Sequence, residues 1–123
     1  MQKIADVVMV ADDVAVRRAL KFLLEVEGLK VRLFDGYAAL LVANNPPLPC
    51  CLIIEHCLPW LDGLELVKIL RTQHADLPVI LFTGQPSLDL DRQAAQLGVR
   101  QILEMPFAAP ELLSAALAVA KNS

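Results

Sequence analysis

Residues 4–13 read IADVVMVADD, and this short stretch decides the class of fold. The run is almost continuously apolar, which is typical of a strand covered on both faces by other parts of the chain. Two adjacent carboxylates, Asp12 and Asp13, end it. Residues 15–27 then carry apolar side chains at a helical period, and Gly28 is a natural helix stop. These residues therefore predict a buried strand followed by an amphipathic helix.

The same alternation of strand and helix continues along the chain. Short β-branched runs alternate with longer segments of helical period, and Asn, Pro and Gly residues separate them. Strands that alternate with helices form a parallel sheet wound on both faces, with right-handed crossovers. The sequence therefore predicts an α/β, doubly wound fold with a five-stranded sheet. The other strands are expected at 30–34, 51–55, 79–83 and 101–104, and the other helices at 37–43, 62–73, 90–97 and 110–121.

Composition and charge restrict the class of protein further. The chain has 123 residues, enough for one domain with one core, and 56% of them are hydrophobic. The net charge of −3 comes from evenly spread charges, so binding to a nucleic-acid backbone is not expected. Prolines interrupt the longest uncharged stretch, 36–54, and Asp6 interrupts the apolar N-terminus, so neither a membrane span nor a secretory signal is predicted. Three cysteines without metal or disulfide spacing agree with a cytoplasmic location.

Candidate site residues follow the strands, because ligand sites of such sheets lie beyond the carboxyl ends of the strands. Asp12 and Asp13 follow the first strand, Glu55 ends the third strand, and Thr83 ends the fourth. Three carboxylates at one spot repel each other, so either a cation neutralises them or at least one carboxyl takes up a proton. Carboxylate oxygens with water completing the shell suit Mg²⁺. The alternative is structural, with Asp13 capping the first helix and Asp12 solvated.

Five segments carry motifs in a fixed order, namely 8–13 (VMVADD), 17–20 (RRAL), 52–63 (LIIEHCLPWLDG), 79–84 (VILFTG) and 98–107 (GVRQILEMPF). Together they resemble the receiver domain of response regulators. In that family the central segment is a hydrophobic strand followed in order by Asp, two residues, Met-Pro, any residue, Met or Leu, and Asp-Gly. The resemblance covers the whole chain. It implies a single receiver domain over 1–123 without an output domain, and the flavodoxin-like strand order 2-1-3-4-5.

The resemblance also implies a mechanism for typical members of the family. A histidine kinase phosphorylates the Asp that ends the third strand, and Mg²⁺ sits on the acidic pair, which is Asp12 and Asp13 here. A Thr and a Lys hold the phosphoryl oxygens, an aromatic residue swings inward, and one face of the domain changes its partners. Thr83 matches the Thr of the family, and the backbone carbonyl of Cys57 matches a further metal ligand.

The chain departs from the family pattern at three functional positions. Glu55 stands at the phosphoacceptor position, Met105 at the lysine position, and Ile102 at the position of the switch aromatic. The extra methylene of Glu55 moves its carboxylate by about 1.5 Å, and a displacement of about 1 Å can cost roughly a hundredfold in rate. Met105 cannot offer the positive charge that stabilises a transferring phosphoryl group. Ordinary phosphorylation at Glu55 is therefore not expected.

These departures predict an atypical receiver, or pseudo-receiver, in two-component phosphorelay signalling. It is not expected to be an enzyme, and it acts through contacts with a sensor histidine kinase or another signalling protein. Glu55 either imitates the charge of an aspartyl phosphate permanently or marks a module that has lost its switch. Two alternatives stay open: conventional phosphorylation at a non-standard site, and a metal-dependent enzyme on a flavodoxin-like fold.

The last predicted helix has almost no polar face, although a surface helix needs only an apolar stripe. The surplus of apolar residues indicates a partner surface, with Leu112, Leu113 and Leu117 as the candidate contacts. A homodimer through this region is the expected result. The alternative is that the many alanines of this helix are simply tolerated at the surface.

Overall fold

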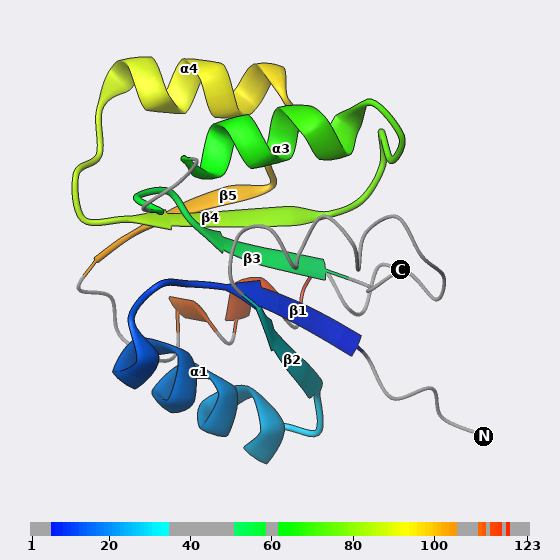
Figure 1. The fold of residues 1–123 in the computed structure, drawn as a ribbon, viewed down its shortest axis with the longest axis vertical. Coiled ribbons are helices and arrows are strands. Elements are labelled where there is room, and N and C mark those ends of the chain that lie inside the picture. The colour runs from blue at the N-terminus through cyan, green and yellow to red at the C-terminus, as the bar shows by residue number, and fades with distance from the viewer. Residues whose placement is uncertain are drawn as a thin grey trace.

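The structure is a computed structural model that describes residues 6–34, 51–58 and 62–105, together with 111–112, 114–116 and 118 near the C-terminus. Five parallel strands form one sheet in the order β2-β1-β3-β4-β5 (Figure 1). This confirms the doubly wound α/β class and the strand order 2-1-3-4-5. The strands are β1 (Asp6–Val10), β2 (Lys30–Phe34), β3 (Cys51–Glu55), β4 (Val79–Thr83) and β5 (Gln101–Glu104).

The burial of each strand follows from its place in the sheet. Every residue of β4 is buried, and β3 is buried from Cys51 to Ile54, because helices cover both faces of these central strands. β2 lies at one edge of the sheet, where Lys30 is exposed and Val31 is buried. The sequence predicted a strand at 30–34, and the structure confirms it and places it at this edge.

The helices form a layer on each face of the sheet (Figure 1). α1 (Val14–Val26) packs on one face together with the C-terminal helical residues, whose Leu112 and Ala116 belong to the same core cluster as Leu24. α3 (Gly63–Arg71) and α4 (Leu88–Gln96) cover the other face. Among the described residues, no helix combines the length and the apolar character that crossing a membrane requires.

Short polar side chains fix where the described helices begin. Asp62 accepts a hydrogen bond from Glu65 N at 2.8 Å and so caps the first turn of α3. Ser87 accepts one from Leu90 N at 3.0 Å, so α4 begins at Leu88, two residues earlier than expected. α3 ends at Arg71 rather than near residue 73. The helix expected at 37–43 lies outside the described residues.

Candidate functional site

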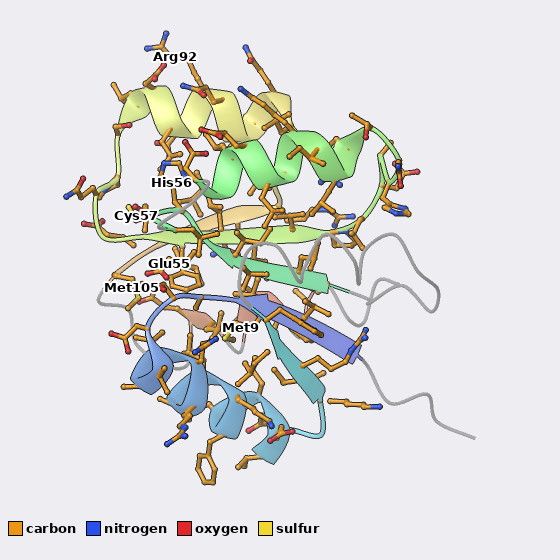
Figure 2. The ribbon with its side chains drawn as sticks, in the orientation of Figure 1. Met9, Glu55, His56, Cys57, Arg92 and Met105 are labelled. Atoms are coloured by element: carbon orange, nitrogen blue, oxygen red, sulfur yellow. The ribbon has the colours of Figure 1, made fainter. Side chains whose placement is uncertain are left out.

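The carboxyl ends of the strands meet at one end of the sheet, as the topology predicted. Figure 2 shows Glu55, His56, Cys57 and Met105 at this end. Met105 N donates a hydrogen bond to the carbonyl oxygen of Thr83 at 2.7 Å, so the loop after β5 is fixed to the end of β4. The residues expected to act together at the ends of β3, β4 and β5 are therefore neighbours in space.

Glu55 connects the end of β3 to the loop that follows β1. Its side-chain Oε1 accepts a hydrogen bond from the backbone N–H of Asp12 at 2.9 Å. Glu55 is partly buried, whereas the side chain of Asp12 is exposed. One oxygen of the carboxylate that ends β3 is thus directed to a backbone donor of the β1–α1 loop.

Asp13 is the N-cap of α1. Its Oδ1 accepts a hydrogen bond from Val16 N at 3.1 Å, and its carbonyl oxygen accepts the first helical bond from Arg17 N at 3.0 Å. This is the structural alternative that the sequence left open for Asp13, and Asp12 is exposed as that alternative requires.

The oxygen atoms at this end of the sheet are of the chemical type that binds a hard cation. Asp12 and Asp13 offer carboxylate oxygens, and Cys57 offers a backbone carbonyl. Within the described ranges, however, no three His, Cys, Asp or Glu side chains stand close enough together to hold a metal ion. The acids do not form a three-ligand cluster, because Glu55 is turned to a backbone N–H and Asp13 to its helix. Mg²⁺ keeps several waters and needs only one or two carboxylates, so the acidic pair and the Cys57 carbonyl are the groups that would hold it.

The other residues that the sequence suggested for the site are buried or packed against the core. Thr83 is only 1% exposed, and its Oγ1 accepts a hydrogen bond from Gln85 N at 3.1 Å. Met105 packs against the core on the α1 side of the sheet, while Ile102 packs against the core under α3 and α4. Neither side chain brings a charge or an aromatic ring to the site.

The structure corrects one expectation about the last helix. Leu112 has no exposed surface and belongs to the hydrophobic core on the α1 side. It was expected in a partner surface, but its position on the helix turns it toward the sheet, so it stabilises the fold instead. Leu113 and Leu117, the other two residues expected there, lie outside the residues whose side chains are described.

Sequence reasoning missed Gly63 as a positioning residue. A Cβ at this position would lie 2.9 Å from the carbonyl oxygen of Glu55, 2.9 Å from His56 Cα and 2.8 Å from Leu81 Cδ1. Gly63 N also donates to the carbonyl oxygen of His56 at 2.8 Å. The first turn of α3 therefore sits directly against the end of β3, where only a residue without a side chain fits. The Asp-Gly pair that starts this helix was the available signal.

The Gly63→Ala substitution is expected to lower the free energy of unfolding by about 2–3 kcal/mol, because two of the three contacts are with backbone atoms that cannot move aside cheaply. Gly84→Ala is the matched control. A Cβ at Gly84 meets nothing within 4 Å, so a change of less than about 1 kcal/mol is expected. Urea denaturation followed by circular dichroism measures both. Equal losses for the two variants would contradict this role of Gly63.

Comparison with known proteins agrees with this geometry. The family model described as the response regulator receiver domain matches residues 7–117. The C4-dicarboxylate transport transcriptional regulatory protein DctD of Pseudomonas aeruginosa is 38% identical over 107 residues, which are 87% of this chain and 23% of DctD. The transcriptional regulatory protein FixJ of Bradyrhizobium diazoefficiens is 36% identical over 99 residues, 80% of this chain and 48% of FixJ. The chain thus spans half or less of the length of these two relatives.

Solved structures give the same result. The receiver domain of the Francisella response regulator 1452 superimposes with a TM-score of 0.88 and 28% identity, covering 96% of this chain and 98% of that one. The chemotaxis protein CheY4 of Vibrio cholerae superimposes with a TM-score of 0.87 and 26% identity, covering 95% of this chain and 99% of CheY4. Receiver domains are in general signalling modules without enzymatic activity that interact with histidine kinases, and they typically bind Mg²⁺ at the phosphorylation site. The chain belongs to the response regulator receiver domain family of two-component signalling.

Proposed function

We propose that this chain is a receiver module that signals through protein contacts without an aspartyl-phosphate cycle at position 55. The observation that carries this proposal is the hydrogen bond from Asp12 N to Glu55 Oε1 at 2.9 Å. In this proposal Glu55 is a fixed structural group, which holds the β1–α1 loop against the end of β3. The partner of the chain is then a sensor histidine kinase or another signalling protein, which recognises the single conformation that Glu55 holds.

Two groups that phosphoryl transfer needs are altered together. The nucleophile at position 55 is one methylene longer than Asp, and one of its oxygens already accepts a backbone hydrogen bond. Position 105 holds a thioether in place of a positive charge, and electrostatic stabilisation supplies most of the catalysis in phosphoryl transfer. Independent losses at the nucleophile and at the charge clamp support a state that does not depend on phosphorylation.

The side chains of Ile102 and Thr83 also act against a conformational switch. Ile102 is packed into the core under α3 and α4 and has no ring whose position could report on Thr83. The hydroxyl of Thr83 accepts a hydrogen bond from its own loop, from Gln85 N. These contacts favour a single conformation of the β4–α4 region.

We also propose that Mg²⁺ binds at the acidic pair, with Asp12, Asp13 and the carbonyl of Cys57 as the protein ligands. The exposed carboxylate of Asp12 supports this, because a hard cation can be reached there without breaking the Glu55 hydrogen bond. When bound, the ion would neutralise negative charge at the strand ends.

Amide nuclear magnetic resonance spectra test this function. Millimolar Mg²⁺ alone is expected to shift the amides around Asp12, Asp13 and Cys57. Further addition of beryllofluoride, an analogue of the phosphoryl group, is expected to change nothing more, because position 55 cannot hold it in line. New shifts at Thr83 and Met105 on adding beryllofluoride would contradict the proposed function. No response to Mg²⁺ would remove the metal site and leave the rest of the proposal standing.

A further inference from the structure

α1 carries an exposed apolar stripe on the side that faces away from the sheet. Phe22 and Val26 are each 67% exposed, and Ala15 and Ala19 are exposed as well. These four residues follow one another at intervals of four, three and four, which is the spacing of the seam in a coiled coil. The face toward the sheet is formed around the buried Leu20 and Leu24, and the partly buried Leu23 lies between that face and the stripe. The apolar side chains of α1 therefore cover more of the helix surface than the fold buries.

Two charges of opposite sign lie along one flank of this stripe. Arg18 and Glu25 are both exposed, and because they are seven residues apart they lie on the same side of the helix. Neither residue forms an ion pair with another residue that the structure describes. The order of these charges does not serve the helix dipole either, since α1 has no acidic residue in its first turn and no basic residue in its last.

The order of the charges does suit a second copy of the same helix running in the opposite direction. Arg18 and Glu25 occupy equivalent places beside the seam, one position before Ala19 and Val26. When two such helices are antiparallel, Arg18 of each copy lies opposite Glu25 of the other, and a two-fold axis generates both pairs.

The sizes of the seam residues also match in this arrangement. With the helices antiparallel, the large side chain of Phe22 lies over Ala19 of the second copy, and Val26 lies over Ala15. A large residue facing a small one in each layer is how helix surfaces interlock without voids. We propose that two copies of this chain associate through α1, antiparallel and two-fold symmetric.

This association is expected to be weak. α1 has 13 residues and is about 20 Å long, so one helix pair buries less than the ~1,200–2,000 Å² of a standard interface. A dissociation constant in the micromolar range or above is expected. The surface is separate from the strand-end site, and the proposal does not rest on the state of Glu55. It also differs from the surface expected on the last helix, of which Leu112 is buried.

Sedimentation velocity of the full chain over a range of concentrations tests the proposal. Wild-type protein is expected to show a reversible monomer–dimer equilibrium. Phe22→Glu removes the central contact and is expected to give a monomer at every concentration. Arg18→Glu and Glu25→Arg each place like charges opposite one another, and each is expected to weaken association about tenfold or more. The double exchange Arg18→Glu with Glu25→Arg restores opposite charges and is expected to recover most of the wild-type affinity.

The design separates association from folding. Glu25→Arg places a cation in the last turn, where the helix dipole favours it, and position 18 lies beyond the first turn, so neither reversal is expected to weaken α1. Thermal unfolding checks this for each variant. Leu88→Glu on α4 is the matched control for Phe22→Glu, because Leu88 is 76% exposed and lies on the other layer. A monomer at all concentrations would overturn the proposal, and so would a dimer that Phe22→Glu leaves intact. Failure of the double exchange to restore affinity would overturn the antiparallel pairing.

Discussion

The double substitution Glu55→Asp with Met105→Lys is expected to make the chain accept a phosphoryl group from acetyl phosphate. The rate at position 55 is expected to exceed that of the wild-type chain by about a hundredfold or more. The shorter Asp side chain draws the carboxylate back from Asp12 N, the donor that Glu55 now contacts. An oxygen of this carboxylate then attacks phosphorus, and acetate leaves.

Lysine at position 105 supplies the missing charge. Met105 is only partly buried, so the methylenes of a lysine can follow the same packing while its ammonium group reaches toward the strand ends. There it stabilises the negative charge that spreads over the phosphoryl oxygens during transfer.

The two single substitutions are the controls for this prediction. Glu55→Asp alone is expected to give slow labelling, since the nucleophile is in place without the charge. Met105→Lys alone is expected to give none, because the carboxylate remains displaced. Peptide mass spectrometry locates the label. If the double variant stays unlabelled while its unfolding transition matches that of the wild type, the explanation by nucleophile position and charge is wrong.

The second large effect concerns stability, and it comes from a single arginine at the end of α3. Arg71 donates hydrogen bonds to four backbone carbonyl oxygens. Its Nε bonds Leu97 O at 2.7 Å and its Nη2 bonds Gly98 O at 3.3 Å, both at the end of α4. Its Nη1 bonds His74 O at 3.0 Å and Leu77 O at 2.6 Å, both in the segment that leads to β4. One guanidinium thus joins α3, the end of α4 and the approach to β4.

Arg71→Met is expected to lower the free energy of unfolding by about 3 kcal/mol and the melting temperature by about 10 °C. Hydrogen bonds from a charged donor are each worth about 1.5–3 kcal/mol, and water replaces part of the loss at the more exposed carbonyls. Burial lowers the pKa of Arg71, Asp76 raises it and Arg100 lowers it, but the group stays charged because arginine keeps its proton throughout the usual range.

Matched variants separate the stability that comes from the hydrogen bonds of the guanidinium group from the stability that comes from its charge. Arg71→Lys keeps the charge, but one ammonium group cannot reach all four carbonyls, so about half of the loss is expected. Lys68→Met removes an exposed cation from the same helix and is expected to change stability by less than about 0.5 kcal/mol. Calorimetry measures all three. An Arg71→Met variant as stable as the wild type would show that these bonds contribute nothing net.

Local patterns predicted the strands and helices well where burial decides them. The apolar runs at 51–55 and 79–83 were predicted as strands, and the structure shows both as buried inner strands of the sheet. The start of α4 was set two residues too late, because one hydroxyl of Ser87 decides it and hydrophobic periodicity does not report such a cap. The sequence also did not predict that Leu112 is buried, because an almost entirely apolar helix does not show which of its sides faces the core.

The candidate site was predicted in its location but not in its bonds. Strand topology alone brings Glu55 and Thr83 to one end of the sheet, so this much followed from the order of elements. The bond from Asp12 N to Glu55 depends on a side-chain rotamer, and the four bonds of Arg71 depend on loops that meet only in the folded chain. Such contacts between distant segments leave no periodic signal in the sequence.

The central claim is that the wild-type chain does not pass through a phosphorylated state at position 55. Incubation of the wild-type chain with acetyl phosphate and Mg²⁺, followed by intact-mass and peptide mass spectrometry, tests it most directly. The claim predicts a chain of unchanged mass under conditions that label the Glu55→Asp, Met105→Lys variant. A phosphoryl adduct on the wild-type peptide that contains Glu55 would contradict it.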